Sequence, residues 1–179
     1  MNPTIELIKR HRSIRKYKPD PLTAEQIAAI VSAAQMASTS SNVQAYSVIG
    51  VTDPAKKKRL AELSGNQAYV EQCPLFLVWC ADLHRLKLAC AKQHTEMMHG
   101  MMENFIIATV DTALAAQNAA LAAESMGLGI VYIGGIRNNP QGVVECLSLP
   151  ELVYPVFGMC VGYPDQEPEI RPRPQMDMV

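Results

Sequence analysis

A long alanine-rich stretch, from about Glu103 to Met126, places the strongest constraint on how this chain folds. Its pattern predicts a helix that is apolar on nearly every side and that ends at Gly127. Small side chains on most of its faces let neighbouring helices approach closely; they are Ala113, Ala115, Ala116, Ala119, Ala120, Ala122 and Ala123. Such a helix has to be buried, and 179 residues offer little protein to surround it. We therefore expect part of it to pack against a second subunit.

Short apolar strands alternate with helices along the rest of the chain. The strands are expected at 47–51, 75–80, 128–135 and 156–161. Helix starts are indicated by Asn2 before Pro3, a capping box of Thr23 and Gln26, Asp53 before Pro54, and Asn139 before Pro140. This alternation indicates an α+β or α/β layered fold. With no internal repeat, we expect one domain that covers 1–179.

Composition narrows the class of protein. A net charge of -1 argues against a nucleic-acid binder, which normally carries a basic surplus. No uninterrupted apolar run approaches the length of a membrane span, and the N-terminus lacks a signal-peptide pattern. Five scattered cysteines without CxxC spacing indicate reduced, mostly buried thiols. We expect a cytoplasmic globular protein.

The segment from 82 to 100 is the least informative part of the sequence. Its two histidines, His94 and His99, are five residues apart, which misses the four-residue spacing of a helical zinc pair, so we propose no metal site. Four methionines follow or lie between them, and they suit either an adaptable pocket or a core. Packing in the core is the favoured interpretation for these residues, Met97, Met98, Met101 and Met102.

Groups able to bind an anion gather just after the N-terminal helix, in the sequence His11-Arg12-Ser13-Ile14-Arg15. Alternate residues of an extended segment share a face, so His11, Ser13 and Arg15 are expected to converge on one ligand. Arginine donates a planar fork of N–H groups and keeps its charge, which suits a phosphate. The alternative is a solvated basic helix end. Two more guanidiniums, Arg171 and Arg173, stand near the C-terminus.

Two further segments have the composition of ligand-facing loops. The loop from 37 to 44 is dense in small donors and lies between a helix and a strand, although a flexible linker has a similar composition. The strand at 128–135 ends in Gly134 and Gly135, and glycine there permits close approach of a flat ligand to the backbone. The GxGxxG spacing of a dinucleotide fold is absent, which weakens a Rossmann interpretation.

Taken together, the motifs resemble those of the FMN-dependent nitroreductase family. Their order is HRSIR, a serine-rich loop with Gln, SGNQxYV, GLGxVYIGGxRNN and a final RPR, and they run from Thr4 to about Pro174. The chain is most similar to the group of oxygen-insensitive NADPH nitroreductases and flavin reductases. The resemblance implies a mainly antiparallel sheet flanked by helices, and a homodimer with FMN at the subunit interface. Relatives continue for several tens of residues past RPR, whereas this chain stops at Val179.

The resemblance also implies a set of site residues. The flavin phosphate and pyrimidine edge would be held by His11, Arg12, Ser13 and Arg15, with Arg171 and Arg173 completing the phosphate clamp. The remaining cofactor-binding positions are Ser38, Thr39, Ser40 and Ser41, often supplied by the partner subunit, Gln67, and the backbone of Tyr132, Ile133, Gly134 and Gly135. Substrate-binding positions are Gln44, Tyr69 and Arg137.

The implied activity is a two-electron, ping-pong reduction of nitroaromatics, quinones or free flavin by NADPH or NADH, with hydride passing through N5 of FMN. No catalytic side chain is needed, because the cofactor supplies the chemistry. Arg15 would stabilise the reduced flavin. Two alternatives stay open: a flavin-binding sensor or carrier without turnover, and a helical dimer module that binds no flavin.

Overall fold

A computed structural model describes residues 2–178 and contains four strands and seven α-helices in that range. The helices are α1 (Pro3–Lys9), α2 (Ala24–Gln35), α3 (Pro54–Leu63), α4 (Ala68–Gln72), α5 (His84–Lys92), α6 (Met102–Ser125) and α7 (Pro140–Leu147). The strands are β1 (Tyr46–Val51), β2 (Leu75–Asp82), β3 (Gly129–Ile133) and β4 (Val153–Gly162). Short 3₁₀ helices lie at η1 (Ser40–Asn42), η2 (Gly134–Asn138) and η3 (Met176–Met178).

The four strands form one sheet in the order β1-β2-β4-β3, and every neighbouring pair is antiparallel. Strand β2 lies in the interior of the sheet and all of its residues are buried. Its side chains alternate between the two faces, as the pleat of a strand requires. Leu75, Leu77 and Trp79 join one hydrophobic cluster, whereas Phe76, Val78 and Cys80 join another. The expected α+β fold with a mainly antiparallel sheet is confirmed.

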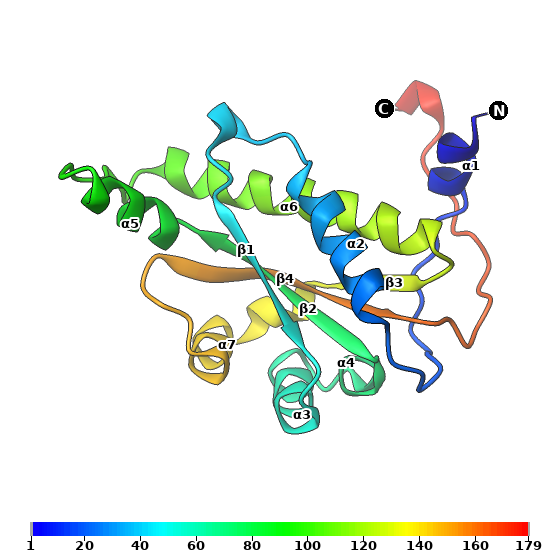
Figure 1. The fold of residues 1–179 in the computed structure, drawn as a ribbon. Helices are drawn as coiled ribbons and strands as arrows, with labels where there is room; N and C mark the ends of the chain where they lie inside the picture. Colours follow the sequence, from blue (N-terminus) through cyan, green and yellow to red (C-terminus); the bar gives the residue numbers. More distant parts are fainter. Residues whose placement is uncertain (1, 179) are drawn as a thin grey trace.

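Helices cover both faces of this sheet (Figure 1). On one face, α2 and α6 pack together over the cluster that contains Trp79. On the other, α3, α4 and α7 pack over the cluster that contains Phe76. Gly158 on β4 makes room for the Phe76 ring, because a Cβ added there would lie 2.3 Å from it. The core is therefore split into two layers by a sheet that is buried on both sides.

The helix starts indicated by the sequence are those that the structure contains. Asn2 accepts a hydrogen bond from the Thr4 amide, and Thr23 and Gln26 form both bonds of a capping box. Asp53 and Asn139 cap α3 and α7 in the same way, each before a proline. Each cap satisfies an amide that the first helical turn leaves without a partner. The two helices that the sequence left unassigned, α4 and α5, lack a side-chain cap.

Helix α6 is buried along one side only. Its alanine side packs on the sheet through Ala115, Ala116, Ala119, Ala120 and Ala123. The other side exposes Ile106, Val110 and Leu114, which are four residues apart and share a face, and Phe105 beside them. We call these four residues the α6 stripe. Although no uninterrupted apolar run was expected to approach a membrane span, α6 is long and apolar enough to cross one by length and composition alone. The buried Asp111 at its centre, and the sheet against it, fit a core helix.

The core interpretation of the methionines is wrong. Met98, Met101 and Met102 are largely exposed, and Met97 is only half-buried. They lie in the turn before α6 and in its first residue, away from the sheet. Outside a helix or strand, the sequence does not indicate whether an apolar side chain points toward the core. The cysteines follow the expectation more closely: Cys73, Cys80 and Cys160 are buried, and all five thiols are free.

Candidate functional site

The basic stretch His11–Arg15 is fixed to the sheet by its one apolar residue, Ile14. The Ile14 amide donates to the Ile130 carbonyl on β3 at 2.9 Å, and the side chain is buried. Gly129 makes this possible, because a Cβ there would lie 2.6 Å from Ile14. The Tyr17 hydroxyl donates to the Ile14 carbonyl at 2.5 Å, and burial raises the pKa of Tyr17, which keeps it a donor. The polar neighbours of Ile14 are therefore held at the surface.

The C-terminal segment returns to lie antiparallel to this stretch. The Lys18 amide donates to the Tyr163 carbonyl and the Asp165 amide donates to the Lys16 carbonyl, both at 2.9 Å. An ion pair of 3.0 Å joins the side chains of Lys16 and Asp165. Residues about 150 positions apart in the sequence thus become neighbours, and the RPR segment is delivered beside HRSIR.

A cavity of about 280 Å³ lies between the two segments. Its lining contains six of the predicted cofactor-binding residues, namely His11, Arg12, Ser13, Arg15, Arg171 and Arg173, together with Pro168 and Glu169. We call it the phosphate cavity. Four guanidiniums face one carboxylate, so its charge is positive. Among residues 2–178, the side chains of Ser13, Arg15 and Arg171 make no hydrogen bond or ion pair. Guanidiniums and a hydroxyl without internal partners suit an anion with several oxygens.

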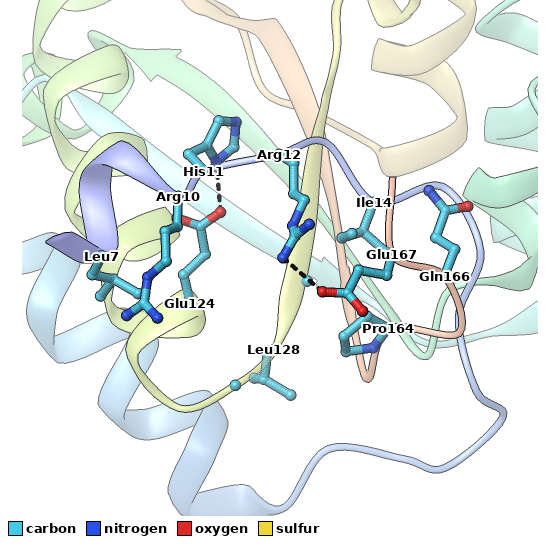
Figure 2. Close-up of a pocket in the computed structure, with 12 residues that line it drawn as sticks. Leu7, Arg10, His11, Arg12, Ile14, Glu124, Leu128, Pro164, Gln166 and Glu167 are labelled. Carbon is cyan, nitrogen blue, oxygen red and sulfur yellow. Dashed lines mark hydrogen bonds and ion pairs between the residues drawn. The ribbon is translucent and has the colours of Figure 1, made fainter. Parts of the chain in front are cut away.

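Two acidic residues hold the remaining donors of the basic stretch (Figure 2). His11 Nδ1 lies 2.5 Å from Oε1 of Glu124, near the end of α6. The Arg12 guanidinium donates to the Pro168 carbonyl at 3.0 Å and to Glu167 Oε1 at 3.1 Å. Both acids also line a second cavity, of about 340 Å³, which shares His11 and Arg12 with the phosphate cavity. Sequence reasoning missed Glu124 and Glu167, since nothing near either residue indicates a partner so distant in the chain.

The SGNQ segment meets the double glycine. A Cβ on Gly135 would lie 2.4 Å from the Ser64 carbonyl and 2.7 Å from Gln67 Nε2. Gln67 donates through Nε2 to the Ser64 carbonyl at 2.8 Å, and its Oε1 accepts from the Tyr69 hydroxyl at 2.6 Å. The absence of a side chain at Gly135 is thus explained by packing inside the chain. Tyr69, expected to contact substrate, is bound to the predicted cofactor residue Gln67.

Tyr132 and Ile133 turn their side chains into the protein. The Tyr132 ring packs edge-on against Phe157 with centroids 5.2 Å apart, and Ile133 is buried. Burial, with a smaller contribution from Glu124, raises the pKa of Tyr132. What these residues could offer a ligand is therefore mainly backbone, and the flavin contact implied by the resemblance stays a prediction. Arg137 is exposed, and it donates to the Val156 carbonyl at 2.6 Å.

The serine-rich loop lies at a different place on the same chain. Asp111 accepts hydrogen bonds from the amides of Ser40 and Ala45, each at 3.0 Å. Asp111 and Glu124 are about 20 Å apart along α6, given a rise of ~1.5 Å per residue. A single chain therefore does not bring Ser38, Thr39, Ser40 and Ser41 to the phosphate cavity. The predicted substrate residue Gln44 stays with this loop, where it donates to Asn42 Oδ1.

The loop is held in an uncommon backbone conformation. Ser41, Asn42 and Gln44 have φ angles of 48°, 58° and 53°, in the left-handed region that non-glycine residues seldom adopt. The Thr39 hydroxyl is buried without a hydrogen-bond partner in the described residues. Strain and an unpaired donor of this kind gather where a segment serves a ligand or partner.

The described residues give little indication of metal binding or of thiol chemistry. Within residues 2–178, no group of three His, Cys, Asp or Glu side chains is arranged to hold a metal ion. Burial raises the pKa of the Cys80 thiol to about 12, so at neutral pH it is protonated and unreactive.

Comparisons with known proteins agree on one family. The model of the nitroreductase family matches residues 8–163. An FMN reductase (NADPH) of Bacillus subtilis (strain 168) is 52% identical over 176 residues, which cover 97% of this chain and 70% of that protein. An oxygen-insensitive NADPH nitroreductase of Salmonella typhimurium is 45% identical over 179 residues, or 100% and 73% of the two chains. The solved structure of an NADPH:FMN oxidoreductase from Vibrio harveyi, complexed with NAD+, has a TM-score of 0.94 and 47% identity, covering 98% of this chain and 75% of that one.

Proposed function

This chain belongs to the nitroreductase family, and on that premise we propose that it is an FMN-dependent oxidoreductase that reduces small acceptors with NADPH or NADH. The acceptor classes are nitroaromatics, quinones and free flavin. The observation that carries the proposal is the phosphate cavity, where two distant basic segments meet. Relatives named as reductases favour turnover over the alternative of a flavin carrier.

The residues of the phosphate cavity fit the terminal phosphate of FMN. Arg15 and Arg171 carry guanidiniums with free N–H groups, and Ser13 adds a hydroxyl. A dianionic phosphate has oxygens enough for all of them, and charge-assisted bonds of this kind are the strong ones. The chain lacks the glycine fingerprint that holds a dinucleotide pyrophosphate, which favours FMN over FAD.

When bound, FMN supplies the redox chemistry, taking hydride from the nicotinamide and giving it to the acceptor. The chain's own residues bind and orient it. Arg15 also lines this cavity and is exposed, and its charge would offset part of the negative charge of the reduced flavin. Gln67 is held on both sides of its amide, by Ser64 and Tyr69, so its orientation is set before the cofactor arrives. The backbone of Gly134 and Gly135 would border the ring.

We further propose that the enzyme is a homodimer. The α6 stripe leaves Phe105, Ile106, Val110 and Leu114 in solvent, which is unfavourable for a monomer. A shallow cavity of about 400 Å³ joins three residues of this stripe to Ser38, Thr39 and Ser40. A partner docked on the stripe would bring its own serine-rich loop to the flavin, which a single chain does not do. The whole chain would act as one FMN-binding domain, working in the cytoplasm with its thiols reduced.

The flavin itself provides the test. The protein, reconstituted with FMN and freed of excess, should carry a flavin that runs as FMN on chromatography after heat release. Anaerobic NADPH or NADH should bleach its absorbance, and a nitroarene should restore it. Release of FAD, or no bound flavin after reconstitution, would contradict the cofactor. Bound FMN that neither donor bleaches would leave a flavin carrier.

A further inference from the structure

Arg12 differs from the other arginines of the phosphate cavity because its guanidinium is already engaged. It donates from Nη1 to the Pro168 carbonyl and from Nη2 to Glu167 Oε1. Both acceptors belong to the C-terminal segment, and Figure 2 shows the Arg12 side chain turned toward Glu167. Arg15 and Arg171, in contrast, have no such bond within residues 2–178. The four guanidiniums of this cavity therefore do not have equal roles.

The position of these two bonds along the C-terminal segment gives them their effect. Upstream, the segment is fixed by the Asp165 amide and by the ion pair between Lys16 and Asp165. Downstream of Pro168, the bonds within the described chain are local, from Arg173 Nη1 to the Arg171 carbonyl and from the Met178 amide to the Gln175 carbonyl. The bonds of Arg12 are thus the last attachment before Arg171 and Arg173, both of which are exposed.

We propose that Arg12 is a positioning residue: it fastens the C-terminal segment at Glu167 and Pro168 so that Arg171 and Arg173 close over the flavin phosphate. This rests on the proposed function, since it takes the phosphate of FMN as the occupant of the cavity. Without the fastening, the segment carrying both arginines is free to move, and ordering it again costs conformational entropy when the cofactor binds. Arg12 acts on the phosphate through Arg171 and Arg173.

Glu167 decides between this role and a direct one. If Arg12 itself bound the phosphate, Glu167 would compete for the same guanidinium, and removing it would tighten FMN binding. If Arg12 is a fastener, Glu167→Ala removes an acceptor and loosens the segment. We expect it to weaken FMN binding by roughly twofold to fivefold, the size of an exposed ion pair. Measurements at about 0.15 M salt screen the distant charge of Glu167.

Glu167→Gln separates the hydrogen bond from the charge. Both Glu167→Ala and Glu167→Gln lose the negative charge, but the amide oxygen of glutamine still accepts from Arg12. We expect Glu167→Gln to bind FMN more tightly than Glu167→Ala. Glu169→Ala is the matched control, because Glu169 lines the cavity without a bond to Arg12. Its removal takes away only repulsion, so it should leave FMN affinity unchanged or raise it.

The same idea makes Arg12 and Arg173 dependent on one another. In a double-mutant cycle, Arg173→Ala should cost much less affinity in an Arg12→Ala background than in the wild type. Additive costs would mean that the two residues bind the phosphate independently, and they would overturn the proposal. So would an unchanged or tighter FMN affinity in Glu167→Ala.

Riboflavin, which lacks the phosphate, distinguishes failure of this inference from failure of the proposed cofactor site. Every variant should bind riboflavin as the wild type does, which shows that it is folded and that its defect lies at the phosphate. A wild-type protein that binds FMN no tighter than riboflavin would remove the proposed cofactor site and this inference with it. A wild type that prefers FMN, with a Glu167→Ala variant that prefers it equally, would remove the inference alone.

Discussion

The two ends of α6 differ in how much of the site a single chain completes. Near its C-terminal end, Glu124 holds His11, and the two basic segments enclose a cavity without help. In its N-terminal half, Asp111 holds the serine-rich loop beside an apolar stripe that nothing in residues 2–178 covers. The first end forms the phosphate cavity within one copy. The second becomes part of the same site only if another copy supplies what this copy lacks.

The physical character of the two ends explains the difference. Charged donors such as Arg15 and Arg171 remain stable in water until an anion arrives, so the anchor needs no cover. Large apolar side chains in water are unfavourable, and each one buried contributes on the order of 1 kcal/mol or more. The end rich in apolar residues is therefore the one that we expect to drive association. Flavin binding should depend on both ends, for different reasons.

The largest effect is expected from a charge placed in the α6 stripe. Leu114→Glu would put an unpaired carboxylate in the subunit interface, at a cost of about 4 kcal/mol, or roughly a thousandfold in association. Light scattering should then give a monomer, and FMN binding should fall with it. Leu88→Glu on α5 is the control, because Leu88 is 51% exposed and Leu114 43%. A Leu114→Glu protein that remains a dimer, or a monomer that binds FMN fully, would break the contrast between the ends.

Arg15→Ala tests the C-terminal end of α6, where a single chain forms the phosphate cavity. Loss of one charge-assisted bond of about 1.5–3 kcal/mol should weaken FMN binding roughly tenfold to a hundredfold. It should also slow flavin reduction, because it removes the cation that we propose to lie nearest the pyrimidine edge. Arg173→Ala should weaken binding with little effect on the reduction rate at saturating FMN. Stopped-flow reduction compares the two. If Arg173→Ala proves the slower variant, the two ends of the flavin have been assigned in reverse.

A smaller loss is expected where Asp111 fastens the loop. In Asp111→Asn an amide N–H replaces one acceptor and faces the amide of Ser40 or Ala45, at a cost of about 1–2 kcal/mol in stability. Urea unfolding at fixed protein concentration should show it, because the stability of a dimer depends on concentration. The exposed Asp20→Asn should unfold as the wild type does. An equal midpoint for both variants would mean that the loop does not need Asp111.

Local patterns in the sequence predicted the four strands and five of the seven helices in residues 2–178, and they marked the two basic segments that line the phosphate cavity. Capping residues such as Thr23, and runs such as 75–80, are decided within a few positions. HRSIR and RPR were recognised by their charge. What they could not reveal is which carboxylate each cation meets, since Glu124 and Glu167 come to His11 and Arg12 only through the tertiary fold. Ile14 was the one available indication of how the stretch is fastened.

Interpretations based on composition alone were less successful. The methionines from 97 to 102 were expected in the core, yet three are exposed and Met97 is half-buried, because the turn into α6 does not direct them toward the sheet. Gly135 was expected to admit a ligand; Ser64 and Gln67 lie where its side chain would be, and the ligand contact stays a prediction. The serine-rich loop was expected along the flavin, often from the partner subunit, and that too stays a prediction; its separation from the phosphate cavity within one chain emerges only when both are placed on α6. Relations of this kind can be recognised only from the folded structure or, for the loop, from a dimer.

The smallest effect is expected at Tyr69, and it shows whether this residue acts on substrate or on cofactor. Tyr69→Phe removes the hydroxyl that donates to Gln67 Oε1 at 2.6 Å, while the bond from Gln67 to the Ser64 carbonyl remains. A single neutral hydrogen bond of about 0.5–1.5 kcal/mol predicts a loss of roughly twofold to tenfold. If Tyr69 acts by holding Gln67, the loss should appear in FMN affinity or flavin reduction and should be the same for every acceptor. If it touches substrate, KM should change and should differ between a quinone and a nitroarene.

Tyr132→Phe is the matched control, because the Tyr132 hydroxyl has no hydrogen bond within residues 2–178, and its ring would keep its contact with Phe157. Equal losses in both variants would mean that the Gln67 bond has no part in the effect.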